Sequence, residues 1–231
     1  MLERKNELFE KYADKVLGWE GKLTSDADDN AVKCLTPQMR ANGQKYHTNR
    51  GVTYCVYLDR AKALGKSPDY DSFVKMDDDG AKDFMLDSIR SLGVSDLPDA
   101  IALSIAEFFW GNEAKPKKYF IASVNELGGN AKTFKEAIEQ SKNIDTLKLY
   151  DNFNRRKADF FEYLINAPSG KWYKWRNGWR RRIKEFNELV RPYAESNEKE
   201  NAPVTNVKKG TSLIILLIAG VLIYYIIQMK K

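Results

Sequence analysis

Apolar residues recur every three or four positions near the start of the chain. The stripe consists of Leu8, Phe9, Tyr12, Val16, Leu17 and Trp19. This spacing predicts an amphipathic helix that runs to Trp19, and Gly21 is available to end it. Glu20 is therefore expected at the end of a helix.

The segment 22–50 has no sustained period, which predicts a loop or small hairpin region. Beyond it, apolar stripes that are closed by glycine or preceded by proline or aspartate predict a succession of helices. The predicted helices cover 52–64, 81–92, 99–110, 116–127, 131–141, 145–166 and 171–190. Alternating apolar and polar residues are nowhere sustained enough to build a large sheet, so the predicted fold class is mainly α.

The segment 211–229 is free of charge and bracketed by the lysine pairs 208–209 and 230–231. At about 1.5 Å per residue it would be about 28 Å long as a helix, close to the thickness of a bilayer core. We therefore predict one transmembrane helix and a single-pass membrane protein anchored by its C-terminus. Because lysines flank both sides, they do not set its orientation. The polar segment 195–210 before it predicts a flexible linker.

Charge and composition narrow the classes of function. Of the formal net charge of +6, four charges lie in the lysine pairs beside the apolar segment, so the rest of the chain is only mildly basic. With one histidine and two cysteines, a typical zinc site and a disulfide framework are not expected. The charged segment 1–11 lacks the apolar stretch of a secretory signal, so conventional export is not indicated.

Three further features leave alternatives open. Cys34 and Cys55 could form a disulfide between the segment 30–47 and the following helix, but free thiols are expected if the protein matures in a reducing compartment. His47 could line a cleft or lie on the surface. The basic aromatic run 171–184 could stack on nucleic-acid bases.

The aromatic residues of that run share one helical face. This face consists of Trp172, Trp175, Trp179, Ile183 and Phe186. Their spacing favours a place in the core, with the arginines in solvent or facing anionic wall or lipid surfaces. We expect no nucleic-acid partner.

Ordered sequence blocks resemble the glycosyl hydrolase family 108 muramidases, which typically read EGGY, DPxD and TNxGIT or TNxGVT. The corresponding blocks are WEG at 19–21, DADD at 26–29 and TNRGVT at 48–53. A late element with Trp175, Gly178, Trp179 and Arg182 is similar to the family's GWxxR. The segments 108–112 and 126–133 are similar to the peptidoglycan-binding segment that these enzymes often carry.

The resemblance implies a lysozyme-like helical domain with a small loop or hairpin region near the active site. Residues 1–110 would form the catalytic lobe and residues 111–194 a helical, peptidoglycan-binding-like lobe that completes the fold. The anchor would follow as the linker 195–210 and the transmembrane helix 211–229.

The resemblance also assigns roles to residues. Glu20 would be the general acid, and Thr48 would position the attacking water. Asp26, Asp28 and Asp29 all lie in the acidic block, and spacing slightly favours Asp29 as the third catalytic residue. The residues assigned to substrate binding are Asp26, Asp28, Asn49 and Trp110.

The expected activity is hydrolysis of the β-1,4 bond between N-acetylmuramic acid and N-acetylglucosamine in peptidoglycan, without metal or organic cofactor. The partners would be glycan strands and, through 211–229, a lipid bilayer. Export would use either a holin-like partner or translocation through the anchor, with the catalytic domain acting on the wall side. Lys22 in place of a glycine and the inserted segment 30–47 support the alternative, a catalytically inactive peptidoglycan-binding or structural protein.

Overall fold

The computed structural model describes residues 2–27, 29–67, 69–111, 115–170 and 172–201. None of the helices in these ranges is both long and apolar enough to cross a membrane. The predicted transmembrane helix 211–229 lies outside the described residues, as does the end of the predicted linker.

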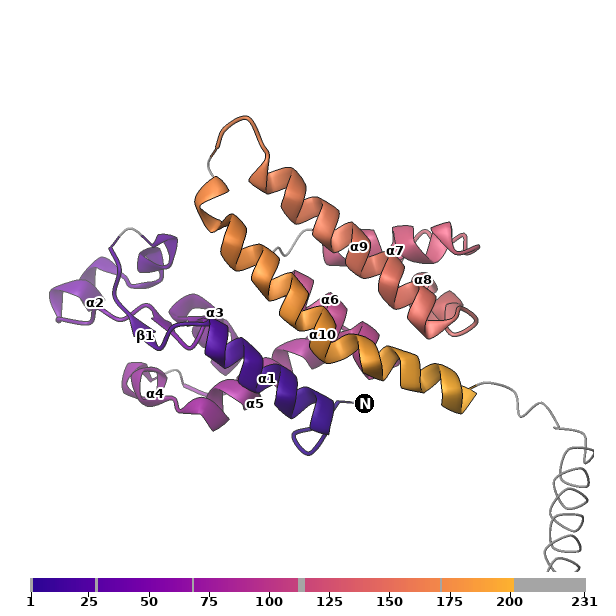
Figure 1. Cartoon of the computed structure of the whole chain (residues 1–231). Helices are drawn as coiled ribbons and strands as arrows, with labels where there is room; N and C mark the ends of the chain where they lie inside the picture. Colours follow the sequence, from indigo (N-terminus) through magenta and orange to yellow (C-terminus); the bar gives the residue numbers. More distant parts are fainter. Residues whose placement is uncertain (1, 28, 68, 112–114, 171, 202–231) are drawn as a thin grey trace, which may run out of the picture.

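The described residues are mainly helical, as predicted, with one small sheet (Figure 1). The helices are α1 (Glu7–Trp19), η1 (Asn30–Cys34), α2 (Pro37–Ala41), α3 (Tyr54–Ala63), α4 (Tyr70–Lys75), α5 (Asp78–Ser91), α6 (Asp99–Gly111), α7 (Pro116–Glu126), α8 (Phe134–Ser141), α9 (Thr146–Ile165), η2 (Tyr173–Trp175) and α10 (Arg176–Asn201). The strands are β1 (Leu23–Thr24), β2 (Thr48–Asn49) and β3 (Val52–Thr53), which pair antiparallel in the order β1-β2-β3.

The core is centred on α6, in which residues 100–108 are all buried. A helix that is apolar on every side needs neighbours all round, and α6 packs against α5, α7, α9 and α10. The long helices α9 and α10 run side by side (Figure 1). One apolar cluster includes residues from Leu2 to Ala194. It therefore spans the predicted division between the lobes 1–110 and 111–194.

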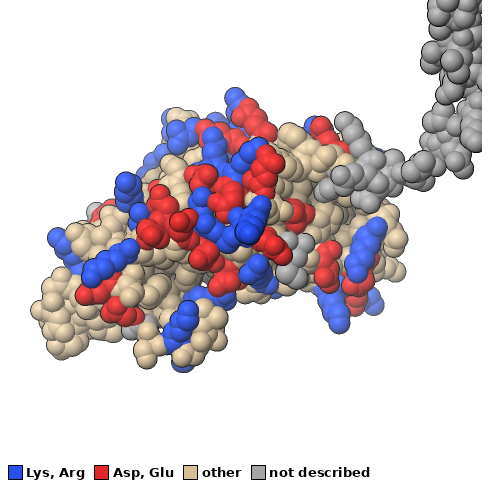
Figure 2. All heavy atoms as spheres, turned by 90° about the horizontal axis from the view of Figure 1, so that it is seen from below, with Lys and Arg blue, Asp and Glu red and all other residues tan. Residues whose placement is uncertain are grey.

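Ion pairs fix α1 against α5 at the edge of this core. The ammonium of Lys82 lies 2.8 Å from a carboxylate oxygen of Glu10 and 2.5 Å from one of Asp14. Acidic and basic side chains are interleaved over the face shown in Figure 2. This face does not carry the continuous basic stripe that typically marks a nucleic-acid interface.

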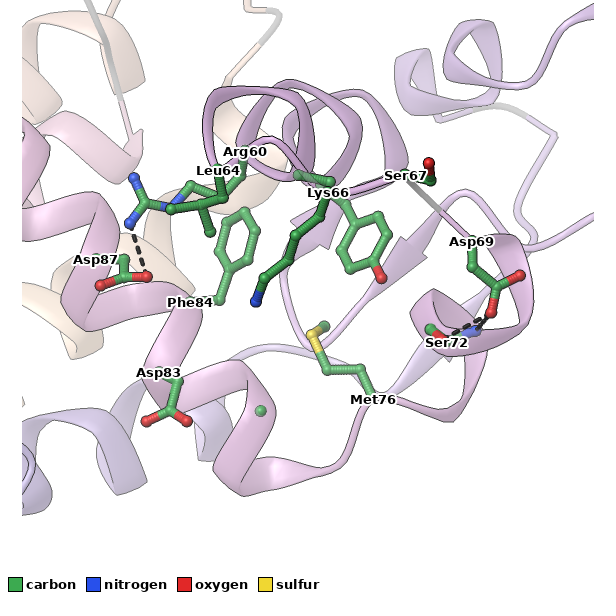
Figure 3. Close-up of a pocket in the computed structure, with 13 residues that line it drawn as sticks. Arg60, Leu64, Lys66, Ser67, Asp69, Ser72, Met76, Asp83, Phe84 and Asp87 are labelled. Carbon is green, nitrogen blue, oxygen red and sulfur yellow. Dashed lines mark hydrogen bonds and ion pairs between the residues drawn. The ribbon is translucent and has the colours of Figure 1, made fainter.

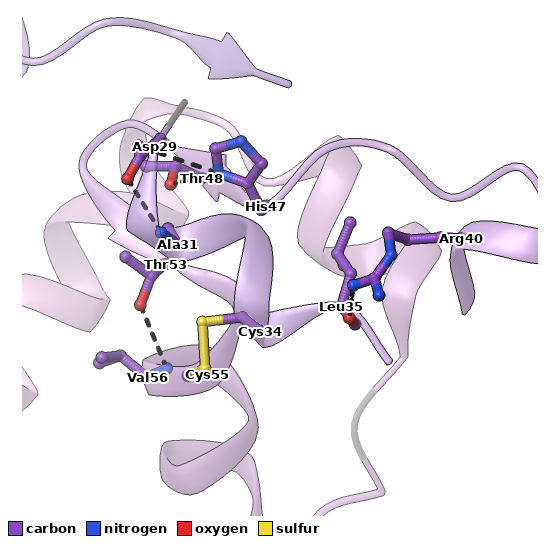
Figure 4. The surroundings of a disulfide bond; sticks show 10 residues. All are labelled: Asp29, Ala31, Cys34, Leu35, Arg40, His47, Thr48, Thr53, Cys55 and Val56. Atoms are coloured by element: carbon purple, nitrogen blue, oxygen red, sulfur yellow. Dashed lines mark hydrogen bonds and ion pairs between the residues drawn. A yellow bond between two sulfur atoms is a disulfide. The ribbon is translucent and has the colours of Figure 1, made fainter. Parts of the chain in front are cut away.

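A second apolar cluster, formed by Leu35, Tyr54 and Phe73, lies beside the small sheet. A disulfide between Cys34 and Cys55 joins η1 to α3 at this cluster (Figure 4). Of the two alternatives for these cysteines, the structure has the disulfide and not the free thiols. Folding of the segment 30–47 back onto α3 brings the two cysteines together, with a Cα–Cα distance of 5.0 Å.

The helix predicted over 52–64 begins later than expected. Val52 and Thr53 belong to β3, and α3 starts at Tyr54 because the Thr53 side chain caps it by accepting a hydrogen bond from the amide of Val56. At the other end of the chain, α10 continues to Asn201. The start of the predicted flexible linker, 195–201, is therefore helical.

The predicted core position of the late tryptophans is correct only in part. Phe186 is fully buried, and Trp172 and Trp179 are half-buried with ring centroids 5.8 Å apart. Trp175 is 52% exposed. Because α10 begins only at Arg176, the helical face inferred from spacing does not extend back to Trp175.

We predict that replacing both cysteines with serine lowers the free energy of unfolding by about 3 kcal/mol. The bridge closes a loop with a sequence separation of 21, and closing a loop of this size restricts the unfolded chain by about that amount. Urea unfolding of the wild type and the Cys34→Ser/Cys55→Ser variant measures the difference. Equal stabilities would contradict a formed disulfide.

Candidate active site

Glu20 lies where α1 ends and the chain turns toward β1. Its amide still donates to the carbonyl of Val16 at 2.9 Å, so it is the last residue held by the helix. Its side chain is 22% exposed. A Cβ atom added to Gly51 would lie 2.8 Å from Cγ of Glu20 and 3.2 Å from Oε2. The carboxyl group of Glu20 therefore lies directly on the β2–β3 hairpin.

The turn of this hairpin is formed by Arg50 and Gly51. Both have positive φ, 50° and 78°, as a two-residue type I′ turn requires. Asn49 and Arg50 hold the turn against the junction of α4 and α5. The fully buried amide of Asn49 donates to the carbonyl of Phe73 at 2.8 Å and of Met76 at 3.2 Å. Arg50 donates to the same Met76 carbonyl at 2.6 Å.

Arg182 of α10 connects Glu20 to the core. Its Nη1 donates to Oε1 of Glu20 at 2.6 Å, and its Nε donates to Oε1 of Glu107 at 2.6 Å. Glu107, on α6, also accepts a hydrogen bond at 3.1 Å from the hydroxyl of Tyr12 on α1. Four side chains from three helices thus form one continuous chain, Tyr12–Glu107–Arg182–Glu20.

Burial and neighbouring charges shift the pKa values of Arg182 and Tyr12 in this row of side chains. Burial alone would lower the pKa of Arg182, but the charges and hydrogen bonds of Glu107 and Glu20 outweigh it and raise that pKa. Burial, and then the negative charge of Glu107, raises the pKa of Tyr12. The guanidinium carbon of Arg182 also lies 4.9 Å from the ring centroid of Trp19. Arg182 is therefore held as a cation whose charge is divided between two carboxylates.

The buried amine of Lys157 lies close enough to Glu107 and Arg182 to feel their charges. Lys157 is 1% exposed, and its Nζ has no hydrogen-bond partner in the described part of the molecule. It lies 3.9 Å from the centroid of the Phe186 ring. Burial lowers the pKa of Lys157 to about 8, although the charge of Glu107 acts in the opposite direction.

His47 organises the predicted acidic block (Figure 4). It is fully buried, its Nε2 lies 2.9 Å from the carbonyl oxygen of Asp26, and its Nδ1 lies 3.1 Å from Oγ1 of Thr48. A carbonyl can only accept, so Nε2 donates to it, and Nδ1 lies within hydrogen-bond distance of the threonine hydroxyl. A carboxylate oxygen of Asp29 lies 4.0 Å from Nδ1. The surface alternative for His47 is therefore wrong.

Thr48 belongs to a row of threonines across the sheet. It pairs with Thr24 of β1 and Thr53 of β3, and directly paired residues share one face of a sheet. Thr53 follows Gly51 by two residues, about 7 Å along a strand. The hairpin thus places the threonine row near the turn on which Glu20 lies.

The structure places the other predicted site residues in different surroundings. Asn49 is fully buried and bonded to backbone carbonyls, so its side chain offers a substrate no surface. Asp26 is exposed, and Asp29 caps η1 by accepting from the amide of Ala31 at 2.9 Å. Asp28 and the side chain of Trp110 lie outside the described residues.

Sequence reasoning missed the roles of Glu107, Tyr12 and His47, and it gave Arg182 no contact with Glu20. A signal existed for Arg182, which belongs to the late GWxxR-like element. A signal also existed for Glu107, which interrupts a mostly apolar run in α6, because a buried carboxylate needs a partner.

A cavity of about 480 Å³ lies elsewhere, between α3, α4 and α5 (Figure 3). Its walls include Tyr57, Leu64, Met76 and Phe84, with Asp83 and other charged residues at its rim. None of the predicted site residues that the structure describes lines it. Across the described ranges, no group of three or more His, Cys, Asp or Glu side chains is arranged to hold a metal ion.

We predict that Gly51→Ala destabilises the protein by two separable effects. The positive φ costs about 1 kcal/mol, and the new methyl group must displace the Glu20 side chain. Urea unfolding should show a larger loss in the wild-type background than in a Glu20→Ala background. Gly43→Ala is the matched control, since Gly43 has φ +81° and open space around it. Equal losses from Gly51→Ala in both backgrounds would contradict the contact.

Lys157 leads to a prediction about pH. Its pKa is about 8 in the folded protein and near 10.5 when unfolded, so the unfolded state binds more protons between these values. Stability relative to a Lys157→Met variant should therefore rise by about 3 kcal/mol from pH 8 to pH 10.5 and stay constant below pH 8. Chemical unfolding of both proteins at pH 7 and pH 10 tests this. A pH-independent difference would show that the amine is solvated.

Comparisons with known proteins point to a fold. No family model matches the sequence, and no curated protein matches it. Among solved structures, the chain is similar to one described as the structure of Brucella abortus SagA, with a TM-score of 0.53 and 13% sequence identity. The match covers 80% of this chain and 95% of that chain. At this identity the likeness is one of helical fold.

Proposed function

We propose that this protein is a membrane-anchored muramidase with Glu20 as its general acid. The observation that carries the proposal is the place of the Glu20 carboxyl group between the hairpin turn at Gly51 and the guanidinium of Arg182. Arg182 fixes Oε1, while Oε2 accepts no hydrogen bond from any residue that the structure describes. Three blocks that resemble family 108 muramidases, around residues 20, 51 and 182, meet at this point.

Glycoside hydrolysis needs an acid at the leaving oxygen and a second group that places water or stabilises the oxocarbenium ion. In the proposed mechanism, Oε2 of Glu20 delivers the proton. Arg182 is also bonded to Glu107, which keeps the guanidinium in place beside Glu20. The substrate would be the β-1,4 bond between N-acetylmuramic acid and N-acetylglucosamine.

Thr48 and Asp29 are the proposed partners of Glu20 on the sheet side. The Thr48 hydroxyl is held 3.1 Å from Nδ1 of His47, and a hydroxyl can bond a water molecule in addition. Asp29, near the same imidazole, would stabilise positive charge in the transition state. Both roles are inferred from the resemblance together with this arrangement.

The proposed location is the wall side of a membrane, with residues 211–229 as the anchor. The Cys34–Cys55 disulfide supports this side, because disulfides persist in oxidising compartments outside the cytosol. The tether would restrict the enzyme to glycan strands near the bilayer. Export through a holin-like partner and translocation through the anchor are both compatible with this location.

A second candidate function is supported by the Glu20–Arg182 ion pair itself. Nη1 of Arg182 already donates to Oε1 of Glu20 at 2.6 Å, so this oxygen is not free for a substrate while the pair is closed. A protein that kept this pair permanently closed would bind peptidoglycan without cleaving it. The inactive peptidoglycan-binding or structural protein is therefore the alternative.

Dye release from labelled cell walls separates the two functions. We expect the full chain to release dye and Glu20→Gln to reduce the rate at least about 100-fold, because general acid catalysis contributes that much or more. Asp151→Asn is the matched control. It also replaces a carboxylate that accepts from an arginine, since Asp151 is hydrogen-bonded to Arg191 at 2.9 Å, but this pair does not belong to the site. If the wild type binds walls from several bacteria but releases no dye, the binding protein is the correct assignment.

A further inference from the structure

Exposed aromatic side chains lie near the C-terminal end of α9 and in η2, which precedes α10. Tyr163 is 71% exposed, Tyr173 is 54% exposed and Trp175 is 52% exposed. The two cations Lys174 and Arg176 lie among them in sequence. We call these five residues the aromatic–cationic platform. None of them belongs to the site around Glu20.

The cations of the platform are bound to its rings. The guanidinium carbon of Arg176 lies 3.9 Å from the ring centroid of Tyr173, and Nζ of Lys174 lies 5.0 Å from the ring centroid of Trp175. No carboxylate of the described residues pairs with either cation. The nearby Arg180 differs, because both its Nε and Nη2 are bonded to Glu162, at 2.6 and 2.7 Å. Lys174 and Arg176 therefore remain available to an anionic partner.

The platform has a firm base. Trp179 of α10 packs between Trp172 and Phe161, with ring centroid distances of 5.8 and 5.1 Å. This packing fixes η2, from which Tyr173 and Trp175 project into solvent. The exposed rings are thus held in place by half-buried ones.

We propose that the aromatic–cationic platform binds the surface of a membrane that contains anionic phospholipids. Tyrosine and tryptophan side chains favour the interface between headgroups and hydrocarbon, and adjacent lysines and arginines are attracted to anionic headgroups. One face of the Tyr173 ring and one of the Trp175 ring is already covered by a cation. That arrangement places two positive charges beside the exposed rings, where headgroup phosphates would lie.

The position of the platform fits a chain that is already tethered to a bilayer. The platform lies at the N-terminal end of α10 (Figure 1). In the sequence, the proposed anchor 211–229 comes after the C-terminal end of this helix. With 26 residues, α10 is about 39 Å long. Anchor and platform would contact the same bilayer when α10 lies along its surface. The inference rests on the proposed membrane location and not on hydrolysis.

The test uses the full chain reconstituted into vesicles of phosphatidylcholine alone or mixed equally with phosphatidylglycerol. The emission of Trp175 is obtained as the difference between the wild type and Trp175→Phe. In the anionic vesicles we expect this emission to shift to the blue and to be quenched by lipids brominated near the headgroup. In phosphatidylcholine we expect the emission of a water-exposed indole.

Charge reversal at the platform provides the matched comparison. Lys174→Glu/Arg176→Glu should lower the membrane-contacting fraction about tenfold or more, since each cation near an anionic surface contributes to binding. Lys33→Glu/Lys45→Glu is the control, because it makes the same change of charge and Lys45 also lies over a ring, that of Tyr46. Retained contact in the platform variant, or identical emission in both lipids, overturns the proposal.

Two further readouts separate this inference from the proposed function. If purified cell walls, and not anionic vesicles, shift the Trp175 emission, the platform binds the wall and the proposal is wrong. Dye release by Lys174→Glu/Arg176→Glu is expected to match the wild type. Loss of hydrolysis alone would therefore count against the enzyme, and loss of lipid contact alone against the platform.

Discussion

The site depends on the two hydrogen-bonded ion pairs that the guanidinium of Arg182 makes. The guanidinium joins α10 to Glu107 on α6 and to Glu20 at the end of α1, so the three helices meet at one shared charge. Arg182 is half-buried, and removing one partner from a fully buried ion pair typically costs about 3–5 kcal/mol. Tyr12 completes the pairing by donating to Glu107. The position of Glu20 is thus set by the packing of the core and not by a loop.

The place of Glu20 at a helix end could be predicted because it depends on a local apolar period and a nearby glycine. Its contact with Arg182 could not, since the two residues are 162 positions apart and periodicity does not say which helices pair. The same limit applies to the Cys34–Cys55 bridge, which depends on how the segment 30–47 folds. Trp175 was misplaced because helical spacing was extended beyond the start of α10 at Arg176.

The two proposed functions differ in what the Glu20–Arg182 pair does when a glycan strand arrives. In an enzyme, Oε2 of Glu20 would deliver a proton to the leaving oxygen and recover one from water, while Glu107 keeps Arg182 in place. In a binding protein, the pair stays closed and the hairpin serves only as a surface. Both proposals include the same helical fold and the same proposed anchor, so they are distinguished by chemistry at one carboxyl group.

The most direct measurement identifies the new sugar ends in peptidoglycan treated with the full chain. Products are reduced with borohydride and the reduced sugar is identified by mass spectrometry. The account predicts reduced N-acetylmuramic acid at the new ends with the wild type, and no new ends with Glu20→Gln. Reduced N-acetylglucosamine would contradict a muramidase, and new ends formed equally by Glu20→Gln would contradict the role of Glu20.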